Sequence, residues 1–89
     1  MLESYIERKL CERIKLKGGL CEKFTSPGRR SVPDRIVTLP GGVIEFVECK
    51  RPGKRPTAMQ KLDHERRQAL GCTVRVIATL QDIDNAYPL

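Results

Sequence analysis

Two runs rich in valine and isoleucine, residues 34–39 and 43–50, constrain the fold of this chain more than any other feature. The tripeptide Pro40-Gly41-Gly42 between them is typical of a turn, so we predict a β-hairpin. Apolar side chains fall on both faces of the second strand, with Val43, Val47 and Cys49 on one face and Ile44 and Phe46 on the other. A strand of this kind is expected inside a sheet rather than at its edge.

The remaining segments supply elements that can pack against this hairpin. An apolar residue recurs every four positions in residues 2–17, which predicts an amphipathic helix that the Gly18-Gly19 pair ends. Further elements are expected as strands over residues 20–24 and 73–78, a helix over residues 58–70 and a short helix over residues 82–86. The order α-β-β-β-α-β predicts an α/β fold, a mixed β-sheet flanked by helices, in a single domain spanning residues 1–89.

The length and the cysteines limit the kind of protein this is. A chain of this size buries only about 60–65% of its unfolded surface, so its core is thin and self-association would add stability. The cysteines at positions 11, 21, 49 and 72 form no CxxC pair and have no histidine at ligand spacing, so we expect small core residues rather than a zinc site. Because no signal segment or membrane-spanning run is found, we expect a cytoplasmic protein with reduced thiols.

The charge balance points to a polyanionic partner. Lys and Arg number 17 against 11 Asp and Glu, which gives a net charge of +6. Such a balance favours nucleic acid, although many basic proteins bind none. With two Phe, two Tyr and no Trp, the chain has few side chains on which bases could stack. Contact with phosphates is therefore the expected mode.

Asp34, Glu48 and Lys50 are the residues with the clearest chemical meaning. The hairpin brings Asp34, at the start of its first strand, beside Glu48 near the end of its second strand. Strand alternation places Glu48 and Lys50 on one face and turns the Cys49 side chain away. Two carboxylates and an ammonium group therefore meet at one edge of the sheet. The carboxylates, with the backbone carbonyl of Cys49, could hold Mg²⁺ together with water and a substrate phosphate.

This set of groups suits phosphodiester hydrolysis. A bound metal would acidify a water molecule and offset charge in the transition state. Lys50 would orient or help to deprotonate that water, or stabilise the developing charge. The alternative is a structural salt bridge between the carboxylates and Lys50, which would leave the neighbouring motif residues unexplained.

The string Pro33-Asp34 … Glu48-Cys49-Lys50 resembles the PD-(D/E)xK nuclease signature, and the wider pattern resembles the VRR-NUC family of that superfamily. The wider match comprises a glutamate-bearing first helix that ends in Gly-Gly, residues 23–30, 32–35 and 45–54, and a helix that opens with Gln60. It covers residues 3–78, nearly the whole chain. Ser31 departs from the family, which often has glycine there, and this affects loop shape more than chemistry.

The resemblance implies a restriction-endonuclease-like fold and a Mg²⁺- or Mn²⁺-dependent DNA endonuclease. Resemblance to stand-alone, phage-type members further implies a homodimer that acts on branched DNA such as four-way (Holliday) junctions. Two alternatives stay open, a non-catalytic DNA-binding module that has kept the nuclease fold and a nuclease with a different DNA substrate. The intact Asp34, Glu48 and Lys50 count against the first.

Glu3, Glu7 and Gln60 are further candidate site residues. Helix geometry projects Glu3 into the apolar stripe and Glu7 to its edge, where an unpaired carboxylate is costly. Each either adds a metal or water contact, which the resemblance favours for Glu3, or is a helix N-terminal glutamate stabilised by the macrodipole. Gln60 closes a capping box with Thr57 or, as in related nucleases, lies beside the metal; the two roles are partly compatible.

Five basic residues lie in loops that flank the site in the sequence: Arg29, Arg30, Arg51, Lys54 and Arg55. Charged side chains are generally solvated at the surface, but a polyanionic substrate favours phosphate contact for these five. His64, the single histidine, lies on the polar side of the second helix, and we expect it to be exposed.

Overall fold

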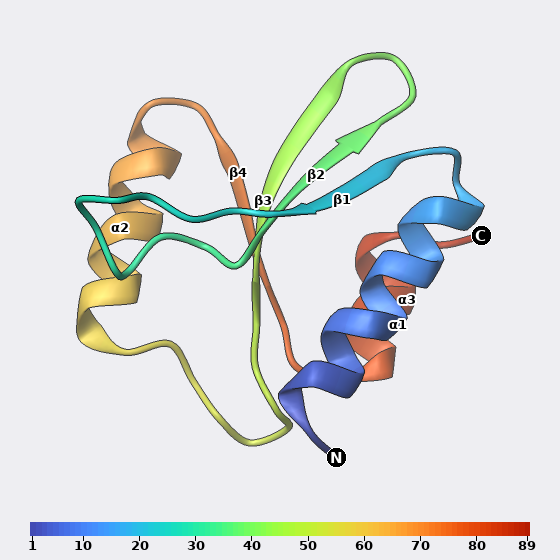
Figure 1. The fold of residues 1–89 in the computed structure, drawn as a ribbon, viewed down its shortest axis with the longest axis horizontal. Coiled ribbons are helices and arrows are strands. Elements are labelled where there is room, and N and C mark those ends of the chain that lie inside the picture. Colours follow the sequence, from blue (N-terminus) through green and yellow to red (C-terminus); the bar gives the residue numbers. More distant parts are fainter.

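A computed structural model describes residues 1–89 and contains one four-stranded sheet with helices on both faces (Figure 1). The elements in chain order are α1 (Glu3–Leu16), β1 (Leu20–Lys23), β2 (Arg35–Leu39), β3 (Val43–Cys49), α2 (Ala58–Ala69), β4 (Thr73–Ile77) and α3 (Leu80–Ala86). The predicted α/β fold and the order α-β-β-β-α-β are confirmed, and a third helix follows β4.

The sheet is mixed, with strand order β1-β2-β3-β4. Strands β1, β2 and β3 pair antiparallel, and β4 pairs parallel to β3. The predicted hairpin is therefore present as β2 and β3, and β3 lies inside the sheet as its two apolar faces required. The last helix begins at Leu80, earlier than expected, because the Thr79 hydroxyl and the Asp82 carboxylate form a capping box.

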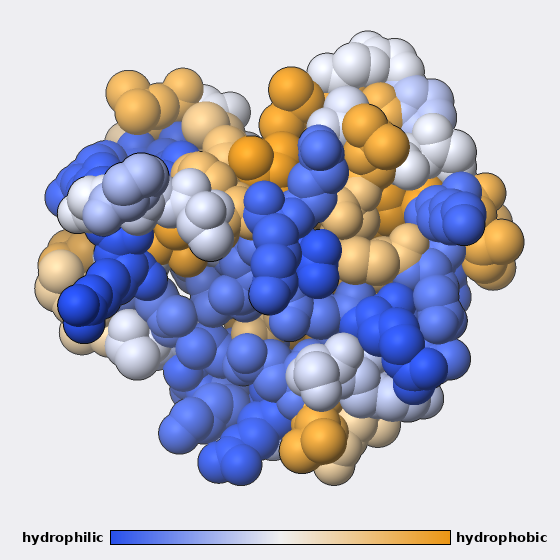
Figure 2. Space-filling view, viewed as in Figure 1, coloured by the Kyte–Doolittle hydropathy of each residue, from blue (hydrophilic) through white to orange (hydrophobic).

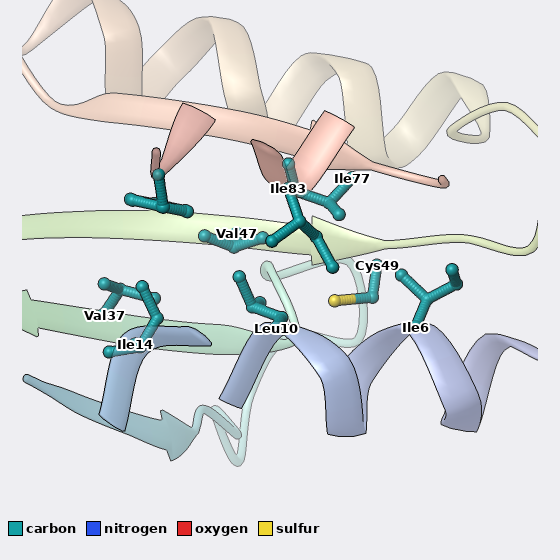
Figure 3. Close-up of a cluster of buried hydrophobic side chains, with 9 residues drawn as sticks. Ile6, Leu10, Ile14, Val37, Val47, Cys49, Ile77 and Ile83 are labelled. Carbon is teal, nitrogen blue, oxygen red and sulfur yellow. The ribbon is translucent and has the colours of Figure 1, made fainter. Parts of the chain in front are cut away.

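The apolar core lies on one face of the sheet, under α1 and α3. Figure 3 shows Ile6, Leu10 and Ile14 of α1 pointing toward the sheet. They meet the side chains that β2, β3, β4 and α3 turn to this face, namely Val37, Val47, Cys49, Ile77 and Ile83. Burial of these side chains supplies the main driving force for folding. Because Ile6 lies close to Cys49, the start of α1 is held near the end of β3 (Figure 3).

Glycine fixes the end of α1 against the sheet. Gly18 has a φ of +80°, and its N–H and that of Gly19 donate to the carbonyls of Lys15 and Ile14. This is the hydrogen-bond pattern of a Schellman motif. A Cβ atom on Gly19 would lie 2.5 Å from the carbonyl oxygen of Thr38 in β2, so only glycine fits.

The opposite face of the sheet, under α2, is polar. The buried residues of α2 are Asp63 and His64, whereas its large apolar side chains Met59 and Leu62 are exposed. Arg67 fastens the helix to the sheet by lying over the rings of Phe24 and Phe46. An ion pair within α2, between Arg67 and Asp63 (2.7 Å), holds its guanidinium group in place. A helix that packs with its charged side inward leaves room for polar side chains of β3 beneath it.

The cysteines are free and only partly fit the expectation that they fill the core. Cys49 is buried, but Cys11, Cys21 and Cys72 are half-buried. The sulfur atoms of Cys11 in α1 and Cys21 in β1 lie 2.9 Å apart as a thiol–thiol contact. None of the three helices combines the length and the apolar composition that a membrane span requires.

Candidate active site

The hairpin register brings Asp34 and Glu48 together. Arg35 of β2 pairs with Val47 of β3, and the two strands are antiparallel. Asp34, which precedes Arg35, therefore lies opposite Glu48, which follows Val47. Oδ2 of Asp34 accepts a hydrogen bond from the backbone N–H of Cys49 at 2.8 Å, which fixes its carboxylate at the end of β3. The juxtaposition predicted from the sequence is present, and it follows from strand pairing alone.

Glu48 is the most enclosed ionisable side chain of this group, with 1% of its surface exposed. Its Oε2 accepts a hydrogen bond from Nε2 of Gln60 at 3.1 Å and lies 3.7 Å from Nζ of Lys50. Its Oε1 is buried and has no hydrogen-bond partner. Lys50 is itself buried, so the two side chains form an ion pair shielded from water.

This environment works against a negative charge on Glu48. The pKa of Glu48 is raised to about 8, chiefly by burial and then by the nearby charge of Asp34, whereas Lys50 opposes the shift. Glu3 adds a weaker effect in the same direction as Asp34. Asp34 and Glu48 share one ammonium group, that of Lys50, and the ionisation of one carboxyl group opposes that of the other. The site therefore has an excess of negative charge that a cation would relieve.

The donor set fits a hard divalent cation. It offers carboxylate oxygens from Asp34 and Glu48, one of which, Oε1 of Glu48, is buried and unpaired. No group of three or more His, Cys, Asp or Glu side chains gathers to hold a metal. Mg²⁺ is commonly bound through one or two carboxylates, with water and substrate phosphate completing its coordination. A cation here would fit that pattern, and the Cys49 carbonyl remains a predicted additional ligand.

Gln60 fills both of the roles considered for it. Its Oε1 accepts a hydrogen bond from the backbone N–H of Thr57, and the Thr57 hydroxyl accepts one from the Gln60 N–H. Its Nε2 donates to Glu48 at the same time. A single amide side chain can do this because its oxygen accepts while its nitrogen donates. The start of α2 is thus tied to the carboxylate of β3.

Glu3 of α1 lies differently from what the helical projection indicated, whereas Glu7 is half-buried, as expected at the edge of the apolar stripe. Glu3 is exposed rather than enclosed in the apolar stripe, because it is the first residue of α1. It is nevertheless close enough to influence the pKa of Glu48. Glu7 is half-buried and pairs with Arg35 at 3.0 Å, so its partial burial is explained by a structural ion pair. A catalytic role for either residue remains a prediction.

His64 is buried, which corrects the expectation that it is exposed. It has 6% of its surface exposed, and its Nε2 lies 3.7 Å from Oε1 of Glu48. The expectation failed because it placed the apolar side of the second helix against the sheet. The spacing from Gln60 was the available indication, since residues four apart share one face of a helix.

The predicted DNA-contact residues are all exposed and lie around the site. Arg29 and Arg30, with Gly28, Ser31 and Gln60, line a surface cleft of about 420 Å³. Arg51, Lys54 and Arg55 lie in the connection from β3 to α2. Figure 2 shows hydrophilic side chains over this connection, in the lower part of the view. Gln60 links the cleft to the carboxylates, because it lines the cleft and contacts Glu48.

Comparison with known proteins identifies the family. No family model matches the chain. The chain is 49% identical, over 97% of its length and 91% of the relative, to the protein named "Putative nuclease p44" of Acyrthosiphon pisum secondary endosymbiont phage 1. It is also similar to a solved structure described as "VRR_NUC domain", with a TM-score of 0.88 and 36% identity over 93% of this chain and 90% of that one. The chain therefore belongs to the VRR-NUC family of nucleases.

Proposed function

We propose that this protein is a Mg²⁺- or Mn²⁺-dependent endonuclease that hydrolyses phosphodiester bonds in DNA. The observation that carries the proposal is the pair of carboxylates, half-buried Asp34 and buried Glu48, beside the buried ammonium group of Lys50. A purely structural ion pair would need one carboxylate for one lysine. The second carboxylate and the unpaired Oε1 of Glu48 are accounted for by a cation.

Each residue then has a defined task. Asp34 and Glu48, with the carbonyl of Cys49, would hold the cation, and a cation there acidifies water and offsets charge on the reacting phosphate. Lys50 donates hydrogen bonds that orient the attacking water or stabilise negative charge on the phosphate. Gln60 holds Oε2 of Glu48 and so keeps the carboxylate in one orientation. Glu3, exposed at the start of α1, is the candidate for an additional water contact.

The DNA backbone would follow the basic surface around the site. Arg29 and Arg30 face the cleft that leads to Gln60, and the β3–α2 connection adds Arg51, Lys54 and Arg55. These exposed side chains can contact phosphates without displacing any internal bond, because none of them forms a hydrogen bond or an ion pair through its side chain within the protein. Phosphate contacts position DNA but do not read its sequence.

We further propose that the protein acts on branched DNA, such as four-way (Holliday) junctions, as a homodimer. Twelve large apolar side chains are exposed, whereas the core cluster holds nine residues. Such a small core leaves apolar surface that a second copy would cover. A dimer would also present two active sites, as cleavage of two strands requires. Shape-based recognition suits a domain whose proposed DNA contacts are to phosphates, since phosphates carry no sequence information.

Cleavage of labelled DNA tests the enzymatic part of the proposal. Linear, flapped and four-way-junction substrates would be incubated with Mg²⁺, Mn²⁺ or EDTA, using wild-type protein, Lys50→Ala and the control Lys15→Ala. Lys15 is exposed on the last turn of α1 and provides a matched loss of one positive charge. We expect metal-dependent cleavage by wild type and Lys15→Ala, and none by Lys50→Ala. Tight binding without cleavage in either metal would identify a non-catalytic DNA-binding module instead.

The substrate preference and the dimer have separate readouts. Faster cleavage of the junction than of linear duplex is expected, and equal rates would point to a nuclease with another substrate. Sedimentation equilibrium would be measured over a range of protein concentrations, against the monomer mass of 10.1 kDa. A monomer at all concentrations that still cuts both junction strands in concert would contradict the dimer.

A further inference from the structure

The side chains of Gln60 and His64 face the two carboxylate oxygens of Glu48. They lie four residues apart on α2, so both project from the same side of the helix. Gln60 reaches Oε2 of Glu48 at 3.1 Å, and His64 faces Oε1 at 3.7 Å. Each carboxylate oxygen of Glu48 is thus faced by one side chain of α2.

The two atoms that lie 3.7 Å apart, one on His64 and one on Glu48, both lack a hydrogen-bond partner. Oε1 of Glu48 and Nε2 of His64 are buried and form no hydrogen bond. Leaving a buried polar atom unpaired is costly, and here two complementary atoms are unpaired at adjacent positions. An imidazole ring always carries at least one N–H donor, and a proton on Nε2 would supply the donor that Oε1 of Glu48 lacks. A shift of less than 1 Å would bring the pair to the roughly 3 Å of an N–H···O bond.

We propose that His64 is a positioning residue for Glu48, and that the Nε2–H of His64 donates a hydrogen bond to Oε1 of that carboxylate. This inference rests on the proposed function, because a carboxylate needs a fixed orientation here in order to hold a cation. Each carboxylate oxygen has two lone pairs, so Oε1 and Oε2 can accept from α2 and still face the Asp34 side. Hydrogen bonds of this kind to ligand carboxylates tune metal affinity in many proteins.

The position of His64 argues against direct contact with DNA. With 6% of its surface exposed, it is too enclosed to contact a DNA backbone directly. His64 does not line the cleft of Arg29 and Arg30, and its Nε2 faces the carboxylate of Glu48 instead. Its effect must therefore pass through Glu48.

Calorimetric titration with Ca²⁺ in the absence of DNA tests the inference on the full chain. The variants are His64→Leu, which removes the donor, His64→Gln, which keeps a donor at similar reach, and the control Gln68→Leu, at an exposed position one turn further along α2. We expect His64→Leu to weaken Ca²⁺ binding about 10- to 100-fold. His64→Gln should recover most of the affinity, and Gln68→Leu should match wild type. Equal affinities for wild type and His64→Leu would overturn the inference.

A second measurement needs neither metal nor a variant. At pH 9, nitrogen-15 NMR of the ring should show the proton of neutral His64 on Nε2, and a proton on Nδ1 would overturn the inference. This readout separates the inference from the proposed function. Wild-type protein that binds no cation and cuts no DNA would refute the proposed function. Wild-type protein that binds a cation and cuts DNA, but carries the His64 proton on Nδ1, would refute only the positioning role of His64.

Discussion

Replacing Glu48 by glutamine is expected to stabilise the metal-free protein at alkaline pH while abolishing cleavage. Glutamine keeps the shape of the side chain and can still accept from Gln60, but it carries no charge. The groups that face position 48 are Asp34 before β2, Lys50 on β3, Gln60 and His64 on α2, and Glu3 at the start of α1. Their combined effect with burial is a carboxyl group that resists ionisation.

The sign and size of the effect follow from the pKa of Glu48. A carboxyl group whose pKa rises from 4.5 to about 8 on folding binds its proton more tightly in the folded state. It therefore imposes no penalty below pH 4.5, and the free energy of unfolding falls as the pH rises from 4.5 to about 8. At about 1.4 kcal/mol for each pH unit, the penalty reaches on the order of 4 to 5 kcal/mol above pH 8. That is a large share of the stability of a small domain, which is about 5–15 kcal/mol.

Urea denaturation followed by circular dichroism, in EDTA from pH 5 to pH 9, measures this effect. The difference in free energy of unfolding between Glu48→Gln and wild type should be small at pH 5 and should widen to several kcal/mol by pH 8. Glu22→Gln, an exposed position on β1, should show no such widening. Mg²⁺ at pH 8 should raise the stability of wild type but not of Glu48→Gln. A difference that stays constant across the pH range would refute the reasoning.

Three further predictions concern the neighbours of the site. Thr57→Ala and Gln60→Ala should each lose about 1 kcal/mol in urea denaturation through the shared helix cap, but Gln60→Ala should lose far more cleavage, because only Gln60 contacts Glu48; equal losses would contradict this. Cys49→Ala should keep cleavage at the cost of roughly 1 kcal/mol of stability, and Cys49→Ser should cost more, because the side chain is buried in the core and the residue contacts the site through its backbone N–H. Arg29→Gln and Arg30→Gln should each lower the slope of log affinity against log salt by about one, measured by fluorescence anisotropy on the Lys50→Ala background, whereas Lys15→Gln should not.

The central pair of the site could be predicted because it depends only on local rules. A turn at Pro40-Gly41-Gly42 sets the register of β2 against β3, and that register places Asp34 opposite Glu48. Strand alternation then assigns Glu48 and Lys50 to one face and Cys49 to the other, as the buried position of Cys49 in the core shows. Each step uses residues that are close in sequence, so no knowledge of tertiary packing was needed.

The positions of His64 and Glu3 could not be predicted because they depend on how helices pack. An amphipathic pattern normally places apolar residues against the sheet, yet α2 turns Met59 and Leu62 outward and packs Asp63 and His64 inward. The helical projection placed Glu3 in the apolar stripe of α1, but the direction of a side chain alone does not determine whether it is buried. The residue opens α1, so it remains exposed.

The polar packing of α2 follows from the needs of the site. If α2 buried its apolar side, the face of β3 beneath it would have to be apolar, and Glu48 and Lys50 could not be there. The helix is instead held by contacts that tolerate charge, with Arg67 over two phenylalanine rings and the capping box at its start. One face of the sheet therefore carries the core and the other carries the chemistry. This division leaves apolar side chains of α2 at the surface, which is where a small chain gains most from a second copy.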